Sequence, residues 1–147
     1  MHETMYDCYQ SQFACMGRIL AKKDVYVSGF AKLYRQTAPT RLYLIGSGSS
    51  FNACAAARPV MEQLLGIEVT ALAPTQLGKA YGERPLAIVL SQGGHSTNTI
   101  AVIQQLKKQG IPVCLLYTSS VAGAADHLDV CHHPDQESGK TARLFPF

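Results

Sequence analysis

A chain of 147 residues, 47% of them hydrophobic and 16% charged, has the composition of one globular domain, neither disordered nor fibrous. The net charge of +3 comes from scattered lysines and arginines, so we expect no nucleic-acid partner. The five cysteines are odd in number and form no C-x-x-C pair, which argues against a disulfide framework and a zinc ribbon. Without a signal-peptide pattern or an apolar segment near the ~20 residues of a membrane span, we predict a cytoplasmic protein with no membrane partner.

Two helices are expected before the first strand. Apolar residues between Met5 and Leu20 recur at spacings of three and four, which predicts an amphipathic helix over residues 3–23. A second helix is expected to end near Thr37, before a proline. Its apolar side carries Val25, Val27, Phe30, Leu33 and Tyr34. We therefore treat residues 1–40 as an N-terminal helical segment that packs on a sheet or on another subunit.

From residue 41 onwards, short apolar runs alternate with helical patterns. Strands are expected at residues 41–45, 67–72, 85–90, 111–117 and 128–130, and helices at 50–65, 96–109 and 122–125, with a loop at 74–84. This alternation predicts right-handed βαβ units. The fold class is therefore α/β: a three-layer, doubly wound, mostly parallel five-stranded sheet.

Residues 46–51, Gly-Ser-Gly-Ser-Ser-Phe, join the first strand to the next helix. Such a junction directs backbone N–H groups and the helix dipole at one spot, where an anion can bind. The dinucleotide pattern G-x-G-x-x-G requires glycine in place of Phe51 and an acid at the end of the second strand, whereas Glu68 is expected at its start. The sequence therefore disfavours a nicotinamide or flavin site, and we expect no cofactor.

Residues 91–99, Ser-Gln-Gly-Gly-His-Ser-Thr-Asn-Thr, repeat this arrangement after the third strand. Two glycines allow close approach of a ligand, while Ser91, Ser96 and Thr99 offer hydroxyl groups. Simple N-capping of the helix is the alternative, but a cap needs only one hydroxyl residue. Because ligands of doubly wound sheets bind beyond the carboxyl ends of strands, we expect both loops to line one pocket.

Taken together, residues 45–53 and 90–99 resemble the two motifs of the sugar isomerase (SIS) domain, and the similarity extends over about residues 3–137. It is greatest to the isomerase half of glutamine–fructose-6-phosphate aminotransferase and to relatives that process aminated or glycated sugar phosphates. The resemblance implies a flavodoxin-like SIS fold over residues 41–147, with a sugar phosphate as ligand.

The resemblance also implies roles for the residues of both loops. Phosphate contacts are implied for Ser91, Gln92, Gly93 and Ser96, and the sugar-facing segment consists of Ser47, Gly48, Ser49 and Ser50. The second motif of the family reads approximately Ser-Gln-Ser-Gly-Glu-Thr, so this chain has glycine in place of a serine at position 93 and His95 in place of an acid. One hydroxyl contact is therefore missing, and the identity of the sugar stays open.

Isomerisation in this family is implied to proceed through an enediol, with a glutamate that moves a proton between two carbons. Glu137 is the candidate for this base; a helix-start glutamate without a chemical role is the alternative. His132 and His133 are candidates to assist ring opening or belong to a solvated loop. No partner ligands at suitable spacing support a metal site around them.

Ten residues follow Glu137, and Pro146 stands where a covering helix would continue. The SIS domain is therefore predicted to be incomplete at its C-terminus. An uncovered sheet face and apolar N-terminal helices favour a homodimer. The leading interpretation is an isomerase, aminotransferase or deglycase of sugar phosphates. A non-catalytic sugar-phosphate sensor, an inactive fragment and a nucleotide-dependent flavodoxin-like enzyme are the alternatives.

Overall fold

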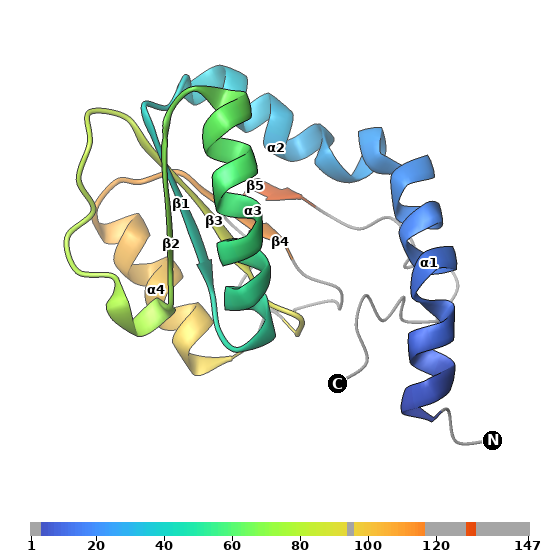
Figure 1. Ribbon diagram of the computed structural model, residues 1–147. Coiled ribbons are helices and arrows are strands. Elements are labelled where there is room, and N and C mark those ends of the chain that lie inside the picture. Colours follow the sequence, from blue (N-terminus) through green and yellow to red (C-terminus); the bar gives the residue numbers. More distant parts are fainter. Residues whose placement is uncertain (1–3, 94–95, 117–128, 132–147) are drawn as a thin grey trace.

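The computed structural model describes residues 4–93, 96–116 and 129–131 (Figure 1). The elements in chain order are α1 (Met5–Ala21), α2 (Lys23–Thr37), β1 (Arg41–Gly46), α3 (Ser49–Leu65), β2 (Glu68–Leu72), η1 (Pro74–Gln76), β3 (Pro85–Leu90), α4 (Thr97–Lys108), β4 (Val113–Leu116) and β5 (Asp129–Cys131). The predicted alternation is confirmed, with boundaries that differ by one or two residues. The predicted short helix at 122–125 lies outside the described residues.

The strands form one sheet in the order β2-β1-β3-β4-β5. Each neighbouring pair is parallel, so the predicted parallel sheet is confirmed. This is the flavodoxin-like order, in which the chain winds outwards from β1 in one direction and then from β3 in the other. The order reverses between β1 and β3, which are neighbours in the sheet.

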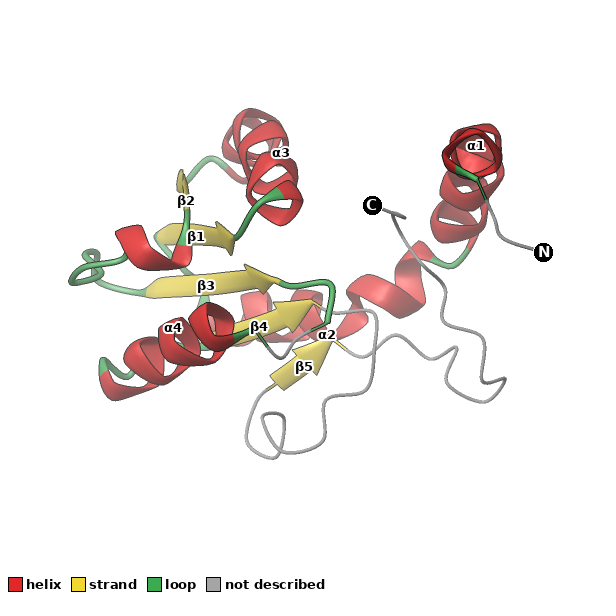
Figure 2. Ribbon diagram, turned by 90° about the horizontal axis from the view of Figure 1, so that it is seen from below, coloured by secondary structure: helices red, strands yellow, loops and turns green. Residues whose placement is uncertain are grey.

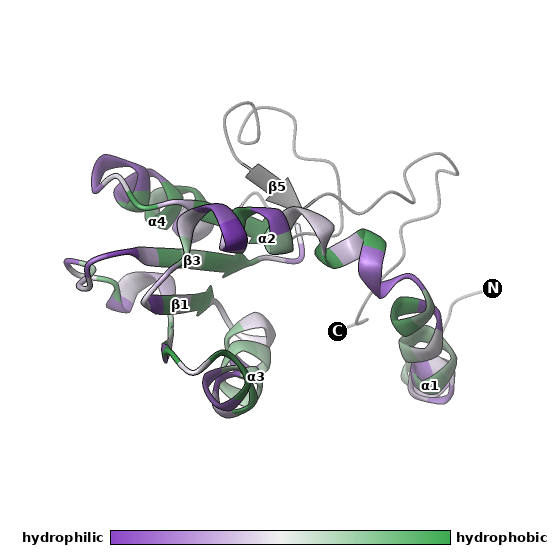
Figure 3. Cartoon of the chain, turned by 90° about the horizontal axis from the view of Figure 1, so that it is seen from above, coloured by the Kyte–Doolittle hydropathy of each residue, from purple (hydrophilic) through white to green (hydrophobic). Residues whose placement is uncertain are grey.

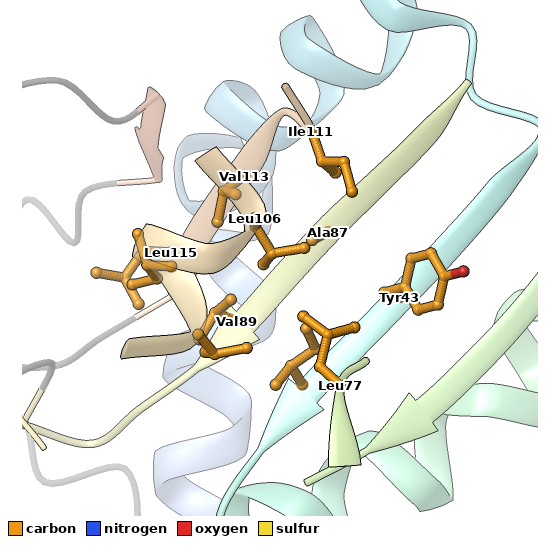
Figure 4. Close-up of a cluster of buried hydrophobic side chains, with 11 residues drawn as sticks. Tyr43, Leu77, Ala87, Val89, Leu106, Ile111, Val113 and Leu115 are labelled. Atoms are coloured by element: carbon orange, nitrogen blue, oxygen red, sulfur yellow. The ribbon is translucent and has the colours of Figure 1, made fainter. Parts of the chain in front are cut away.

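Two hydrophobic clusters flank the sheet, because successive strand residues point to opposite faces. The cluster on the α2–α3 face consists of Leu33, Leu42, Leu44, Cys54, Val69, Leu86, Ile88 and Cys114. The cluster on the α4 face consists of Tyr43, Ile45, Leu77, Ala87, Val89, Val102, Ile103, Leu106, Ile111, Val113 and Leu115 (Figure 4). Helices thus lie on both faces of the sheet, which gives the predicted three layers (Figure 2).

The two N-terminal helices differ in their packing. Leu33 of α2 is buried, and Phe30 and Tyr34 pack against the same cluster, so the second half of α2 covers the sheet. The first half of α2 leaves Val25 and Val27 about half exposed. Helix α1 extends away from the sheet (Figures 1 and 2). Packing on the sheet, the first of the two expected arrangements, therefore holds only for the second half of α2.

The predicted loop at 74–84 begins with the short helix η1 and is tied to α4. The side-chain amide of Gln105 donates to the carbonyl oxygens of Leu77 (3.0 Å) and Gly78 (2.8 Å). The side-chain oxygen of Gln109 accepts from the N–H of Ala80 at 2.9 Å. Because these partners lie far apart in the sequence, local patterns do not reveal them.

Within the described residues, no helix is long and apolar enough to cross a membrane.

Candidate functional site

The two loops rich in glycine and hydroxyl groups lie side by side at the carboxyl edge of the sheet. Gly46, the last residue of β1, is in register with Leu90, the last residue of β3. The chain therefore enters both loops at the same level. β1 and β3 are also the strands between which the order reverses, where doubly wound folds form their ligand crevices. The structure thus brings the two predicted segments together.

A close contact between β1 and α3 keeps the first loop short. A Cβ atom on Gly46 would lie 2.6 Å from the carbonyl carbon of Ser50 and 2.8 Å from the nitrogen of Phe51. The backbone of α3 can approach the end of β1 this closely only because residue 46 is glycine. Gly48 has a φ of +58°, in the left-handed region, and forms the N-cap of α3. These two glycines place the start of α3 directly at the strand end.

The hydroxyl groups of the first loop are at the surface. Ser47 and Ser49 are exposed and Ser50 is partly buried. The N–H of Ser50 donates to the carbonyl oxygen of Ser47 at 3.2 Å, which closes the turn. Since the N-cap is a glycine, no side chain caps α3, and its positive end faces this edge of the sheet. The segment can therefore present hydroxyl groups and a helix N-terminus to a ligand.

The second loop is tied to the sheet and to α4 at its two ends. The N–H of Ser91 donates to the carbonyl oxygen of Leu116, on β4, at 3.0 Å. Ser96 is the N-cap of α4, and its hydroxyl oxygen accepts from the N–H of Thr99 at 3.2 Å. The capping alternative is therefore correct for Ser96. It does not account for the partly buried Ser91 or the exposed Gln92.

Thr99 differs from its predicted role. Its side chain is only 2% exposed, so it is a poor candidate for direct contact with a ligand. Its Oγ1 lies 2.5 Å from Oγ of Ser96 and donates to Oγ of Ser91 at 3.4 Å. The expectation that this hydroxyl is offered to a ligand is thus corrected: it contacts the two serines of the loop instead.

Neither loop carries a charged side chain: residues 46–53 and 90–99 contain no lysine, arginine, aspartate or glutamate. An anion bound between them would rely on hydroxyl groups, amides and backbone N–H groups. α3 and α4 are the helices that follow β1 and β3 in the chain, so both direct their positive ends to this edge. The chemistry of the edge therefore suits a small anion with neighbouring hydroxyl groups.

Cys54 lies one helical turn beyond Ser50 and belongs to the core. Its side chain is 2% exposed, and burial raises the pKa of the thiol to about 11. The thiol is therefore protonated at neutral pH and is not an activated nucleophile.

Of the remaining residues that the sequence analysis considered, the structure describes only Glu68. His95, His132, His133 and Glu137 lie outside the described residues. Glu68 opens β2 at the opposite, amino edge of the sheet, as the sequence predicted. In the described part of the chain, no three His, Cys, Asp or Glu side chains gather in a way that could hold a metal ion.

A family model and several known proteins match this chain. The family model of the SIS domain matches residues 37–142. A relative from Arabidopsis thaliana, glutamine–fructose-6-phosphate aminotransferase [isomerizing] 1, is 32% identical over 88 residues, which cover 57% of this chain and 13% of that protein. The chain therefore spans a small part of the length of this relative.

Solved structures share the fold. A Clostridium difficile protein, provisionally named a phosphosugar isomerase, matches with a TM-score of 0.72 at 21% identity, over 95% of this chain and 41% of that one. The sugar isomerase domain of an RpiR transcription factor from Sphaerobacter thermophilus matches with a TM-score of 0.60 at 18% identity, over 88% of this chain and 75% of that one. At these identities the likeness establishes the fold alone.

Proposed function

The chain belongs to the SIS domain family, and we propose that its two neighbouring loops bind a phosphorylated sugar. The observation that carries this proposal is the register of Gly46 with Leu90 at the point where the strand order reverses. This register supports the proposal, because both strands end at one level just before the two hydroxyl-rich segments. A phosphate group is the anion that helix N-termini commonly bind without a lysine or arginine.

In this proposal the phosphate binds to the second loop and the sugar hydroxyls face the first. The phosphate-contacting residues are Ser91, Gln92, Gly93 and Ser96; the sugar-facing residues are Ser47, Gly48, Ser49 and Ser50. The capping hydroxyl at the start of α4 and the partly buried serine after β3 support the assignment of the phosphate. The exposure of the first loop supports the assignment of the sugar.

Titration calorimetry with fructose 6-phosphate and glucosamine 6-phosphate tests the proposal, with fructose and AMP as comparison ligands. We expect the two sugar phosphates to bind and fructose and AMP to bind much more weakly. Ser91→Ala should weaken sugar-phosphate binding by ~1.5–3 kcal/mol, as for a lost hydrogen bond to a charged group. Thr97→Ala, on the exposed side of the first turn of α4, is the matched control and should bind normally. Absence of binding by any hexose phosphate, or tighter binding of AMP, would contradict the proposal.

We further propose that the protein to which this domain belongs interconverts aldose and ketose (amino)sugar phosphates. The isomerizing aminotransferase relative supports this, and Glu137 is the proposed base, with His132 and His133 as candidates to assist ring opening. The alternative is a non-catalytic sensor, which the RpiR transcription factor supports. In an enzyme, Glu137→Gln should abolish turnover and retain binding; in a sensor or an inactive fragment, the unaltered chain has no turnover to lose.

We also propose that the chain pairs with a second copy through α1. Large apolar side chains on this helix are exposed at spacings of three and four, as in a helix–helix seam. Figure 3 shows that α1 carries both hydrophobic and hydrophilic residues. They are Tyr6 (69%), Tyr9 (64%), Phe13 (80%), Met16 (48%) and Leu20 (65%). Sedimentation should show a dimer that Phe13→Glu dissociates and Gln12→Glu, on the same helix, does not. A monomeric unaltered chain would contradict this pairing.

We also propose that the protein is cytoplasmic. Cys15 and Cys54 are free thiols, which fits a reducing compartment. Cell fractionation of the tagged protein tests it, and recovery in a secreted fraction would overturn it.

A further inference from the structure

Thr99 is the one residue that the structure classes as buried and polar among those whose side chains it describes. It lies in the first turn of α4, behind the second loop. A hydroxyl group in such a place is costly unless it forms hydrogen bonds. The partners of Thr99 are the serines that precede and follow the two loop glycines, which makes its position informative about the loop.

The hydroxyl of Thr99 connects the two ends of the second loop. Its Oγ1 lies 2.5 Å from Oγ of Ser96 and 3.4 Å from Oγ of Ser91. The cap of α4 uses the main-chain N–H of Thr99, which donates to Ser96 at 3.2 Å. The cap is therefore complete without the Thr99 side chain, and the hydroxyl has a separate effect: it sets the two serine hydroxyls at a fixed distance from each other.

We propose that Thr99 is a positioning residue of the phosphate-binding loop, which holds the hydroxyl of Ser91 in place at the anion site and is itself anchored to Ser96. This inference rests on the proposed function, because it deepens the assignment of the phosphate to this loop. Thr99 itself does not touch the ligand. It acts through Ser91.

The proton count of the three hydroxyl groups supports this role. Each group has one proton to donate. Thr99 donates its proton to Ser91, so its contact with Ser96 is a hydrogen bond only if Ser96 is the donor. In this chain of hydroxyl groups the Ser96 proton is used within the loop, and the Ser91 proton is the one that Thr99 does not use. Thr99 therefore supports the hydroxyl of Ser91 from behind, as a donor to its oxygen.

The test compares Thr99→Val with Thr99→Ser in titrations with fructose 6-phosphate. Valine has nearly the shape of threonine but no hydroxyl, so we expect binding about five- to tenfold weaker, as for one or two lost hydrogen bonds. Thr99→Ser restores the hydroxyl and should bind within about twofold of the unaltered chain. Thr97→Val, at an exposed position of the same turn, is the control and should not change binding.

A double-mutant cycle separates positioning from a general structural effect. If Thr99 acts through Ser91, Thr99→Val should weaken binding less in the Ser91→Ala background than in the unaltered chain. Melting temperatures are measured for every variant; if Thr99→Val does not fold, Thr99→Ala replaces it in the cycle. Normal binding by Thr99→Val, or effects that multiply fully, would overturn the inference and leave the proposed function standing. Failure of the unaltered chain to bind fructose 6-phosphate would overturn both.

Discussion

The two edges of the sheet use different side chains for different purposes. At the carboxyl edge, β1 and β3 run into glycines and small hydroxyl residues, and two helices begin there. At the amino edge, large side chains form the hydrogen bonds. The hydroxyl of Tyr43 accepts from the N–H of Tyr81 at 2.8 Å and donates to its carbonyl oxygen at 3.0 Å. The Arg84 side chain donates to the carbonyl oxygen of Ala38 at 2.8 Å.

An ion pair completes the amino edge. Arg41 of β1 forms an ion pair with Glu68 of β2. Two hydrogen bonds raise the pKa of the Arg41 guanidinium: the one to Glu68 has the larger effect and the one to Tyr43 the smaller. The polar groups of this edge are thus occupied in joining strands and loops to each other. The comparison indicates that the amino edge stabilises the fold, whereas the carboxyl edge keeps its side chains small and leaves room for a ligand. Four experiments test this distinction.

The largest effect is expected for Gly46→Ala at the carboxyl edge. The new methyl group would meet backbone atoms of Ser50 and Phe51 at 2.6–2.8 Å, so α3 must shift. We expect a loss of roughly 3 kcal/mol in the free energy of unfolding, measured by urea denaturation, as for severe overpacking. Gly78→Ala is the control: no atom lies within 4 Å of the new Cβ and its φ is not positive, so we expect a change of only about 0.5 kcal/mol. Equal losses in both variants would contradict the close contact as the cause.

Tyr43→Phe tests the amino edge. It removes the hydroxyl that holds Tyr81 and leaves an N–H group without its acceptor, so we expect unfolding to become easier by about 1–2 kcal/mol. Sugar-phosphate binding, measured under conditions where the variant is folded, should not change. A clear loss of affinity would show that the two edges are coupled.

The pH dependence of the free energy of unfolding tests the burial of Cys54 in the core between the two edges. Burial raises the pKa of the Cys54 thiol from an ordinary value of 9.0 to about 11, so the unfolded chain loses this proton first. The stabilising effect is therefore complete below pH 9 and declines as the pH rises towards 11. At pH 10 we expect a loss of about 1.4 kcal/mol relative to pH 8 from this group. Cys54→Ala should lack that component; a parallel pH profile in both proteins would contradict it.

The smallest effect is expected for Glu68→Gln. The Glu68 side chain is 55% exposed, so its ion pair with Arg41 should contribute only about 0.5 kcal/mol and weaken in high salt. Urea denaturation at low and high salt measures this difference. The affinity for a sugar phosphate should stay the same. A large loss of this affinity, or of the free energy of unfolding, would mean that the ion pair does more than join β1 to β2.

Several features were predicted from the sequence because they depend on local patterns. Apolar runs ended by glycine or proline located β1 to β4 to within two residues, and Gly66 ends α3 in the left-handed conformation expected of a helix stop. Glycine and hydroxyl residues after two strands identified both loops. These signals are local because strand and helix periodicities are properties of a few consecutive residues.

Other features could not be predicted in this way. The spacing of apolar residues predicted α1 as a helix, yet the same pattern does not say what that helix packs on, and the structure leaves it apart from the sheet. Thr99 looked like one more hydroxyl of the loop, although its spacing of three residues from Ser96 is a signal for a contact within one helical turn. Burial of its side chain depends on the neighbouring core, which the local sequence does not contain.

The α/β alternation, the parallel sheet and the two motifs that indicate the SIS family follow from the amino-acid sequence alone. The folded chain was needed to show that Gly46 and Leu90 end their strands at one level, that Gly46 permits the contact with α3, and that Thr99 joins the serines of the second loop. These two groups of features depend on interactions of different range. Hydropathy and turn preferences act over a few residues, whereas strand register, close backbone contacts and burial depend on segments that meet only in the folded chain.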